Sequence, residues 1–137
     1  MKAVVADCSI IIPWYFPEKN TGIADKLKMQ FHQKTVLCHS PSLLTAEFGN
    51  VAWKKIIRGE CDIFLAIKQL CLFLITGIHY HDCRRLVADA LAVGHKCNIT
   101  VYDSLYLVLA KTLDMSLATL DERLNNAANS IGVQLYQ

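Results

Sequence analysis

Charged residues are scarce in this sequence. They make up 19% of its 137 residues, whereas 53% of the residues are hydrophobic, a more apolar balance than that of an average soluble domain. A chain of this length buries roughly two thirds of its surface in one core, so some apolar surface is left for a partner or a second subunit. We therefore expect one domain, residues 1–137, that forms a homo-oligomer.

The sequence also lacks a membrane-length apolar run and a recognisable signal peptide. Its most apolar stretch, from Ile63 to Ile78, is interrupted by Lys68 and Gln69 and falls short of the roughly 20 uncharged residues that a membrane span requires. This stretch is typical of a core helix instead. The N-terminus enters strand-like sequence without an apolar segment and a cleavage site, so we expect a cytoplasmic protein.

Cysteine motifs for metal or redox chemistry are missing as well. The six cysteines form no CxxC pair, which favours buried free thiols over disulfides. Four of them lie in apolar patterns: Cys8, Cys61, Cys71 and Cys97. The stretch HYHDC at 79–83 offers three potential zinc ligands, but its spacing matches no common zinc motif, so we interpret its histidines as surface residues.

Short apolar runs alternate with helical periodicities along the chain. Strands are predicted at 3–6, 35–38, 115–119 and 133–136, with a short strand or a connector near 78–80. Helices are predicted at 21–34, from Ser40-Pro41 to near Gly59, at 61–76, from Asp82 to 96, from Thr100 to 114 and at 121–129. Such alternation is typical of a three-layer α/β/α sandwich with a mostly parallel sheet.

Four acidic residues stand out against this pattern. In open parallel sheets, ligands bind beyond the carboxyl ends of the strands. Asp7 directly follows the first strand, and Asp121 follows the strand SLAT in the same way. Asp103 lies in the first turn of the helix that begins at Thr100, and Glu47 lies about two turns into the helix after Pro41.

Each acid has an ordinary structural explanation. Asp7 and Asp121 suit the capping of turns and helices, Asp103 suits the positive end of a helix dipole, and Glu47 could face solvent. Asp7 and Asp103, however, lie in very apolar sequence, where an unpaired carboxylate is costly. Because no basic residue stands directly beside these two, we hypothesise that a hard divalent cation, Mg²⁺ or Mn²⁺, compensates the acids.

The segments around these acids resemble the four acidic motifs of PIN domains. The segments are VVADCS, LLTAEFGNVAWKKIIRG, TVYDSLYLVLA and LATLDERL. In order and spacing they are most similar to VapC-type toxins of toxin–antitoxin pairs, and the similarity spans nearly the whole chain. It implies a PIN fold and a metal-dependent endoribonuclease that leaves 5′-phosphate and 3′-hydroxyl ends.

The resemblance also implies the site residues. Asp7, Glu47, Asp103 and Asp121 would be the catalytic, metal-binding acids. Three polar residues would support them: Ser9, Asn50 and Thr119. The implied partners are an RNA, such as a tRNA or a ribosomal RNA, a VapB-like antitoxin and a second copy of the chain.

Basic residues near the acids are candidates for contacts with the RNA backbone. The net charge of +2 is too small to indicate nucleic-acid binding by itself, so local clusters matter. Lys54 and Arg58 share a predicted helix face with Glu47 and Asn50. Lys111 and Arg123 lie close in sequence to acids. Ordinary solvated charges are the alternative for each.

Three other functions compete with this interpretation. A PIN nuclease of RNA processing would keep the chemistry without an antitoxin, and a catalytically silent PIN module would bind RNA or protein only. A phosphatase with Asp7 as covalent nucleophile is a third. Enzymes of the haloacid dehalogenase type carry a second Asp two residues later, whereas this chain has Ser9.

Overall fold

A computed structural model describes all residues, 1–137, and contains a four-stranded sheet. The strands are β1 (Lys2–Ala6), β2 (Val36–Pro41), β3 (His79–His81) and β4 (Ser116–Ala118). Their order is β3-β2-β1-β4, and all neighbouring pairs are parallel. The predicted α/β architecture with a parallel sheet is confirmed.

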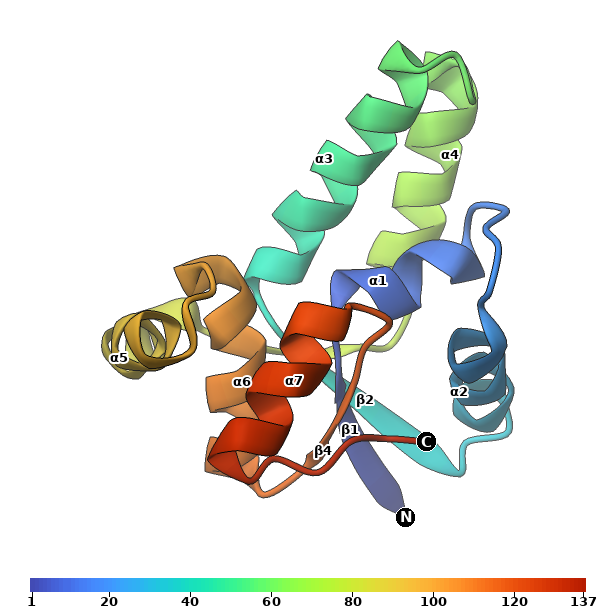
Figure 1. The fold of residues 1–137 in the computed structure, drawn as a ribbon. Coiled ribbons are helices and arrows are strands. Elements are labelled where there is room, and N and C mark those ends of the chain that lie inside the picture. The colour runs from blue at the N-terminus through green and yellow to red at the C-terminus, as the bar shows by residue number, and fades with distance from the viewer.

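Helices connect the strands and cover the sheet on both faces (Figure 1). The helices are α1 (Cys8–Ile11), α2 (Gly22–His32), α3 (Leu43–Ile57), α4 (Ile63–Leu74), α5 (Val87–Cys97), α6 (Val101–Leu113) and α7 (Glu122–Ile131), with 3₁₀ turns η1 (Ile12–Trp14) and η2 (Cys83–Arg85). None of them is long enough and apolar enough to cross a membrane.

The sheet separates two hydrophobic cores. Val4 and Ala6 of β1 point into the core shared with α1 to α4, whereas Val5 points into the core shared with α5 to α7. This follows from the two-residue period of a strand. Helix α6 is the most deeply buried helix, because every residue from Ser104 to Ala110 is buried. Its packing fixes the position of the first turn of α6 relative to β1.

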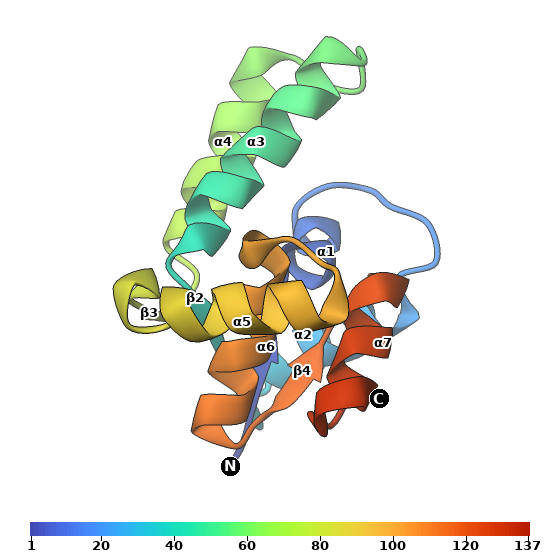
Figure 2. The same ribbon diagram turned by 60° about the vertical axis from the view of Figure 1, so that its left-hand side comes forward.

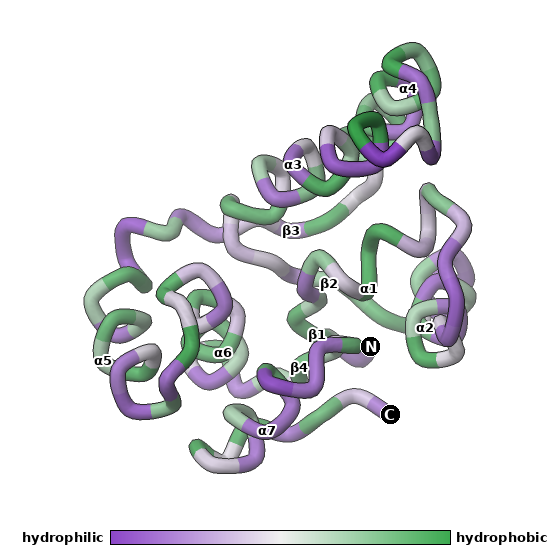
Figure 3. The backbone as a smooth tube through the Cα atoms, turned by 45° about the horizontal axis from the view of Figure 1, so that its top comes forward, coloured by the Kyte–Doolittle hydropathy of each residue, from purple (hydrophilic) through white to green (hydrophobic).

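Helices α3 and α4 form a hairpin that projects beyond the carboxyl edge of the sheet (Figures 1 and 2). The helix predicted at 61–76 is present as α4, but the prediction that the apolar stretch from Ile63 to Ile78 is a core helix is largely wrong. Only Ala66 and Phe73 of α4 are buried, although most residues of this helix are apolar (Figure 3). One face of α4 packs on α3, and the other carries exposed apolar side chains such as Phe64.

Two predicted element boundaries are also wrong. Ser40 and Pro41 end β2 instead of starting α3: the Ser40 hydroxyl donates to the Ala6 carbonyl at 3.2 Å, and α3 begins at Leu43. Proline is tolerated there because it ends the strand. The predicted strand 133–136 is reduced to a single parallel bridge between Leu135 and Leu117.

The cysteines are free, but they are less buried than predicted. Only Cys38 is buried, Cys71 is exposed, and the other four are partly accessible. Cys71 is exposed because it lies on α4 in the projecting hairpin.

Candidate active site

Asp7 stands at the carboxyl end of β1, where the chain turns into α1. It caps α1, since its Oδ1 accepts from the Ile10 N–H at 3.3 Å. The same carboxylate also accepts from the hydroxyls of Ser9 at 2.6 Å and Thr119 at 2.5 Å. The side chain is buried, and burial raises its pKa to about 7 even though these three hydrogen bonds lower it.

The end of β4 lies directly beside Asp7 because β4 is the parallel neighbour of β1. Thr119 donates to Asp7 and accepts from the Asp121 N–H at 3.0 Å, while the Ser9 hydroxyl accepts from the Leu120 N–H at 2.8 Å. Two hydroxyls thus tie the ends of both strands together. The structure brings Ser9, Thr119 and Asp121 close to Asp7. The strand ends alone predicted Asp121 as a neighbour, whereas Ser9 and Thr119 were implied by the resemblance to PIN domains.

Asp121 serves as the N-cap of α7. Its Oδ1 accepts from the N–H groups of Arg123 at 2.9 Å and Leu124 at 3.4 Å. The capping interpretation is therefore correct for this residue, but capping occupies one oxygen only. Since Oδ2 is not used by the cap, capping and ligand binding are compatible at Asp121.

Glu47 and Asp103 approach the same edge from α3 and α6. Glu47 accepts a hydrogen bond from the buried Tyr106 hydroxyl. Burial raises the pKa of Glu47, and the charge of Asp103 raises it further. Burial likewise raises the pKa of Asp103, with an added contribution from Asp121, while Arg123 lowers it. Each of the four acids therefore lies within electrostatic reach of another: Asp7 of Asp121, Asp121 of Asp103, and Asp103 of Glu47.

No ion pair neutralises this acidic cluster. The salt bridges of the protein join Lys55 to Glu18 and Glu60, and Arg84 to Asp82. A cluster of carboxylates held by neutral hydroxyls is the donor set that Mg²⁺ and Mn²⁺ favour. No three of these side chains come together as ligands around one point; Asp7 and Glu47 instead accept hydrogen bonds from hydroxyl groups. The donor set fits a hard cation.

The predicted basic and amide residues lie at different distances from the acids. Arg123 is close enough to Asp103 to lower its pKa. Lys54 and Arg58 lie two and three turns beyond Glu47 along α3, about 10 and 16 Å farther by helix rise. Asn50, one turn beyond Glu47, is exposed.

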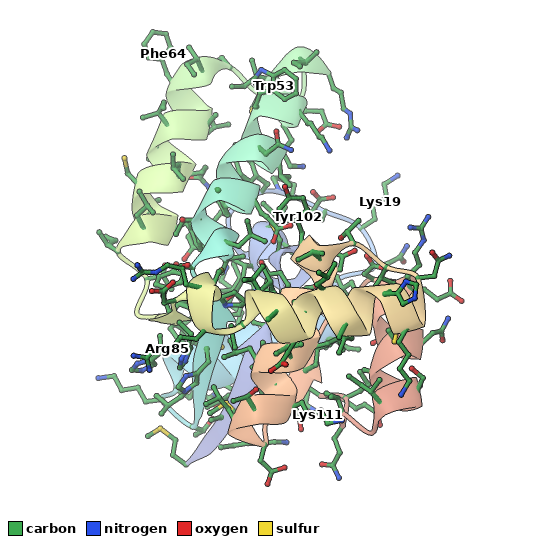
Figure 4. All side chains as sticks on the ribbon, turned by 90° about the vertical axis from the view of Figure 1, so that its left-hand side faces the viewer. Lys19, Trp53, Phe64, Arg85, Tyr102 and Lys111 are labelled. Carbon is green, nitrogen blue, oxygen red and sulfur yellow. The ribbon has the colours of Figure 1, made fainter.

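Lys111 does not join the site. Its ammonium donates to the Ile131 carbonyl at 3.4 Å, and it lines a cavity with Lys2 and Asp114 near the start of β1. Figure 4 shows it at the opposite end of α6 from Tyr102, the neighbour of Asp103. Nearness in sequence to Asp103 was misleading because eight residues of helix span about 12 Å.

Sequence reasoning missed Tyr106. It is 1% exposed, and its hydroxyl donates to Glu47. The signal was present, because a tyrosine within the apolar run LYLVLA needs a buried partner for its hydroxyl. Tyr106 stands one turn after Asp103, so α6 carries one acid and the donor that holds another.

Replacing Tyr106 with Phe is expected to lower the free energy of unfolding by about 1.5 kcal/mol, because a hydrogen bond to a carboxylate is lost. Urea denaturation measures the change. Tyr102→Phe is the matched control, since Tyr102 lies on the same helix but is 62% exposed. Equal stability of the two variants would contradict the role of the Tyr106 hydroxyl.

The sequence matches the PIN-domain family over residues 4–130. The chain belongs to the PIN-domain family. This PIN domain is 32% identical over 127 residues to Ribonuclease VapC3 of Pyrobaculum aerophilum, covering 90% of this chain and 92% of the relative. It is 33% identical over 92 residues to Ribonuclease VapC1 of Mycobacterium tuberculosis, covering 66% and 68%. It is thus homologous to VapC ribonucleases.

Solved structures share the fold of this PIN domain. The crystal structure of PAE2754 from Pyrobaculum aerophilum superposes with a TM-score of 0.69 at 19% identity, covering 93% of this chain and 79% of that one. Mycobacterium tuberculosis VapC20, described as a toxin that cleaves the sarcin–ricin loop, superposes with a TM-score of 0.65 at 12% identity, covering 90% and 94%. The PIN-like fold predicted from the acidic motifs is confirmed.

Proposed function

We propose that this PIN domain is a metal-dependent endoribonuclease toxin of the VapBC type, acting in the cytoplasm. The observation that carries the proposal is the acidic cluster at the carboxyl edge of β1 and β4, in which no acid forms a salt bridge. The homology of the chain to VapC ribonucleases also supports ribonuclease activity. The substrate would be a tRNA or a ribosomal RNA, cut by hydrolysis of a phosphodiester bond.

Asp7, Asp103 and Asp121 would hold the cation, and Glu47 would complete the site. A bound Mg²⁺ or Mn²⁺ supplies an activated water and stabilises charge on the phosphate. The chain's own contribution is to position the ligands: Ser9 and Thr119 fix Asp7, and Tyr106 fixes Glu47. Arg123, beside Asp103, would contact the RNA backbone near the scissile phosphate.

The proposed protein partners are a VapB-like antitoxin and a second copy of the chain. Exposed apolar side chains on the α3–α4 hairpin support such interfaces, since monomers rarely expose large contiguous apolar patches to water. Trp53 is 56% and Phe64 is 82% exposed, and both lie near the end of the hairpin (Figure 4). An antitoxin bound along α3 would cover Glu47 as well.

The direct test is cleavage of purified tRNA and ribosomal RNA by the purified protein. We expect cleavage with Mg²⁺ or Mn²⁺, no cleavage after chelation with EDTA, and 5′-phosphate ends at the cut sites. Mapping of RNA ends in cells after induction would identify the target. Growth arrest that an antitoxin encoded next to the gene relieves would separate a toxin from an RNA-processing nuclease. Binding of RNA without any metal-dependent cleavage would favour the silent module instead.

Lys54→Ala combined with Arg58→Ala is expected to weaken RNA binding several-fold. Each lost phosphate contact should also reduce the slope of log affinity against log salt by about 0.7 for single-stranded RNA. Fluorescence anisotropy over a salt series measures both. Lys111→Ala is the control, because that lysine lies at the other edge of the sheet. An unchanged salt slope in the double variant would remove α3 from the RNA interface.

A further inference from the structure

A cavity of about 350 Å³ opens beside the acidic cluster. Its lining includes the apolar side chains of Cys8, Ile12, Val51 and Leu120. Ser9 also borders the cavity, and its hydroxyl donates to Asp7 at 2.6 Å. Cavities of this size hold small organic ligands in other proteins. None of the four acids lines this cavity, so it is a neighbouring but separate feature.

Several residues that line the cavity are close in sequence to the acids. Cys8 directly follows Asp7, Leu120 directly precedes Asp121, and Val51 lies one helical turn after Glu47. Ser9 and Leu120 both line the cavity, and the Leu120 N–H donates to the Ser9 hydroxyl, which in turn donates to Asp7. A substrate bound at the acids would extend a neighbouring group into the cavity.

The rim of the cavity carries one cation without an acidic partner. Glu18 lies on the rim, but its carboxylate is bound by Lys55 at 2.6 Å. Lys19 also lies on the rim, is exposed, and takes part in no salt bridge. It extends from the loop between η1 and α2 (Figure 4). Lys19 therefore favours a negatively charged group at the mouth of the cavity, whereas the apolar lining residues favour an apolar group inside it.

We propose that this cavity receives one unpaired base of the RNA, next to the phosphate at the acids, and that Lys19 contacts an adjacent phosphate. An unpaired nucleotide presents both features, because its base has a flat, largely apolar face and its backbone carries a negatively charged phosphate. The inference rests on the proposed ribonuclease function and adds a determinant of sequence preference. It requires the RNA to be single-stranded at the cut site.

The test measures binding of short single-stranded RNA to the Asp7→Asn protein by fluorescence anisotropy, with an abasic ribose placed at each position in turn. We expect one abasic position to weaken binding about tenfold, the scale of one base contact. Adding Val51→Trp, which fills the cavity, should weaken binding of intact RNA by a similar factor and abolish the abasic effect. Val87→Trp, the same change at an exposed position of α5, should behave like the parent.

Lys19→Gln provides a second variant that perturbs no packing. It should weaken binding of intact and abasic RNA equally and reduce the salt slope by about 0.7. The proposal would be overturned if no abasic position weakened binding, or if an abasic position weakened binding to the Val51→Trp variant as much as to the parent. If Val51→Trp left RNA binding unchanged but abolished binding of a co-expressed antitoxin, the cavity would be a protein-binding site. That outcome would also overturn the proposal. Absence of metal-dependent cleavage by the unmodified protein would refute the ribonuclease function instead, and the binding assay does not depend on cleavage.

Discussion

Asp7→Asn is expected to reduce RNA cleavage on the order of 10³-fold while the protein stays folded. The amide keeps the shape of the carboxylate but cannot supply its charge to a cation. The fold tolerates the change because the hydroxyls of Ser9 and Thr119 can accept as well as donate hydrogen bonds, so both can still pair with an amide. The measurement is the rate of cleavage of a mapped RNA target at saturating Mg²⁺, with circular dichroism as the check of folding.

Asp114→Asn is the matched control for Asp7→Asn. Asp114 is exposed and ends α6 in the left-handed conformation, with φ of 53°, which asparagine adopts readily. It lies on the cavity near the start of β1, at the edge of the sheet away from the acids. Its cleavage rate should equal that of the unmodified protein. An Asp7→Asn protein that cut the same RNA at the same sites would refute the assignment of Asp7.

Without metal, the stability of the protein is expected to fall as the pH rises from about 4 to about 7. The pKa of Asp7 is about 7 in the folded chain and near 4 in an unfolded chain. Between these values the unfolded chain releases the Asp7 proton and the folded chain retains it, so ionisation favours unfolding. The loss amounts to up to about 4 kcal/mol across this window. The raised pKa values of Glu47 and Asp103 act in the same direction.

Urea denaturation of EDTA-treated protein at pH 5 and pH 8 measures this change. Asp7→Asn should remove most of the decline, and the comparison isolates Asp7 from the histidines, which also titrate in this range. Mg²⁺ should restore stability at pH 8 more than at pH 5, because the ionised carboxylates bind it. Metal-free stability that stayed constant or rose between pH 5 and pH 8 would show that Asp7 is ionised in the folded chain.

The sequence predicted the strand ends and their acids because both depend on local signals. An apolar β-branched run followed by Asp7, and SLAT followed by Asp121, place the acids at one edge once the strands are parallel. The end of β2 was predicted wrongly because Ser40-Pro41 has the composition of a helix start, while a long-range hydrogen bond from Ser40 to Ala6 holds it in the sheet. Local sequence carries no information on that contact.

Properties that depend on how helices and strands are placed relative to one another could not be predicted from the sequence either. Apolar periodicity in α4 predicts a helix, but it does not reveal that the helix projects beyond the sheet with Phe64 exposed. The position of Lys111 at the far edge follows from the direction of α6. The pairing of Tyr106 with Glu47 joins residues 59 positions apart, so only the assembled fold brings the two groups together.

In the projecting α3–α4 hairpin, one helix carries both an acid of the proposed site and an exposed apolar side chain suited to binding a partner. Helix α3 carries Glu47 near its base and Trp53 farther out, six residues or about 9 Å along the axis. A protein that binds Trp53 would therefore need only a short additional segment, running along α3, to cover the acids. Under the proposed function, a partner that extends from the exposed end of the hairpin to its base would block the entry of RNA to the acids, so binding of that partner would inhibit cleavage.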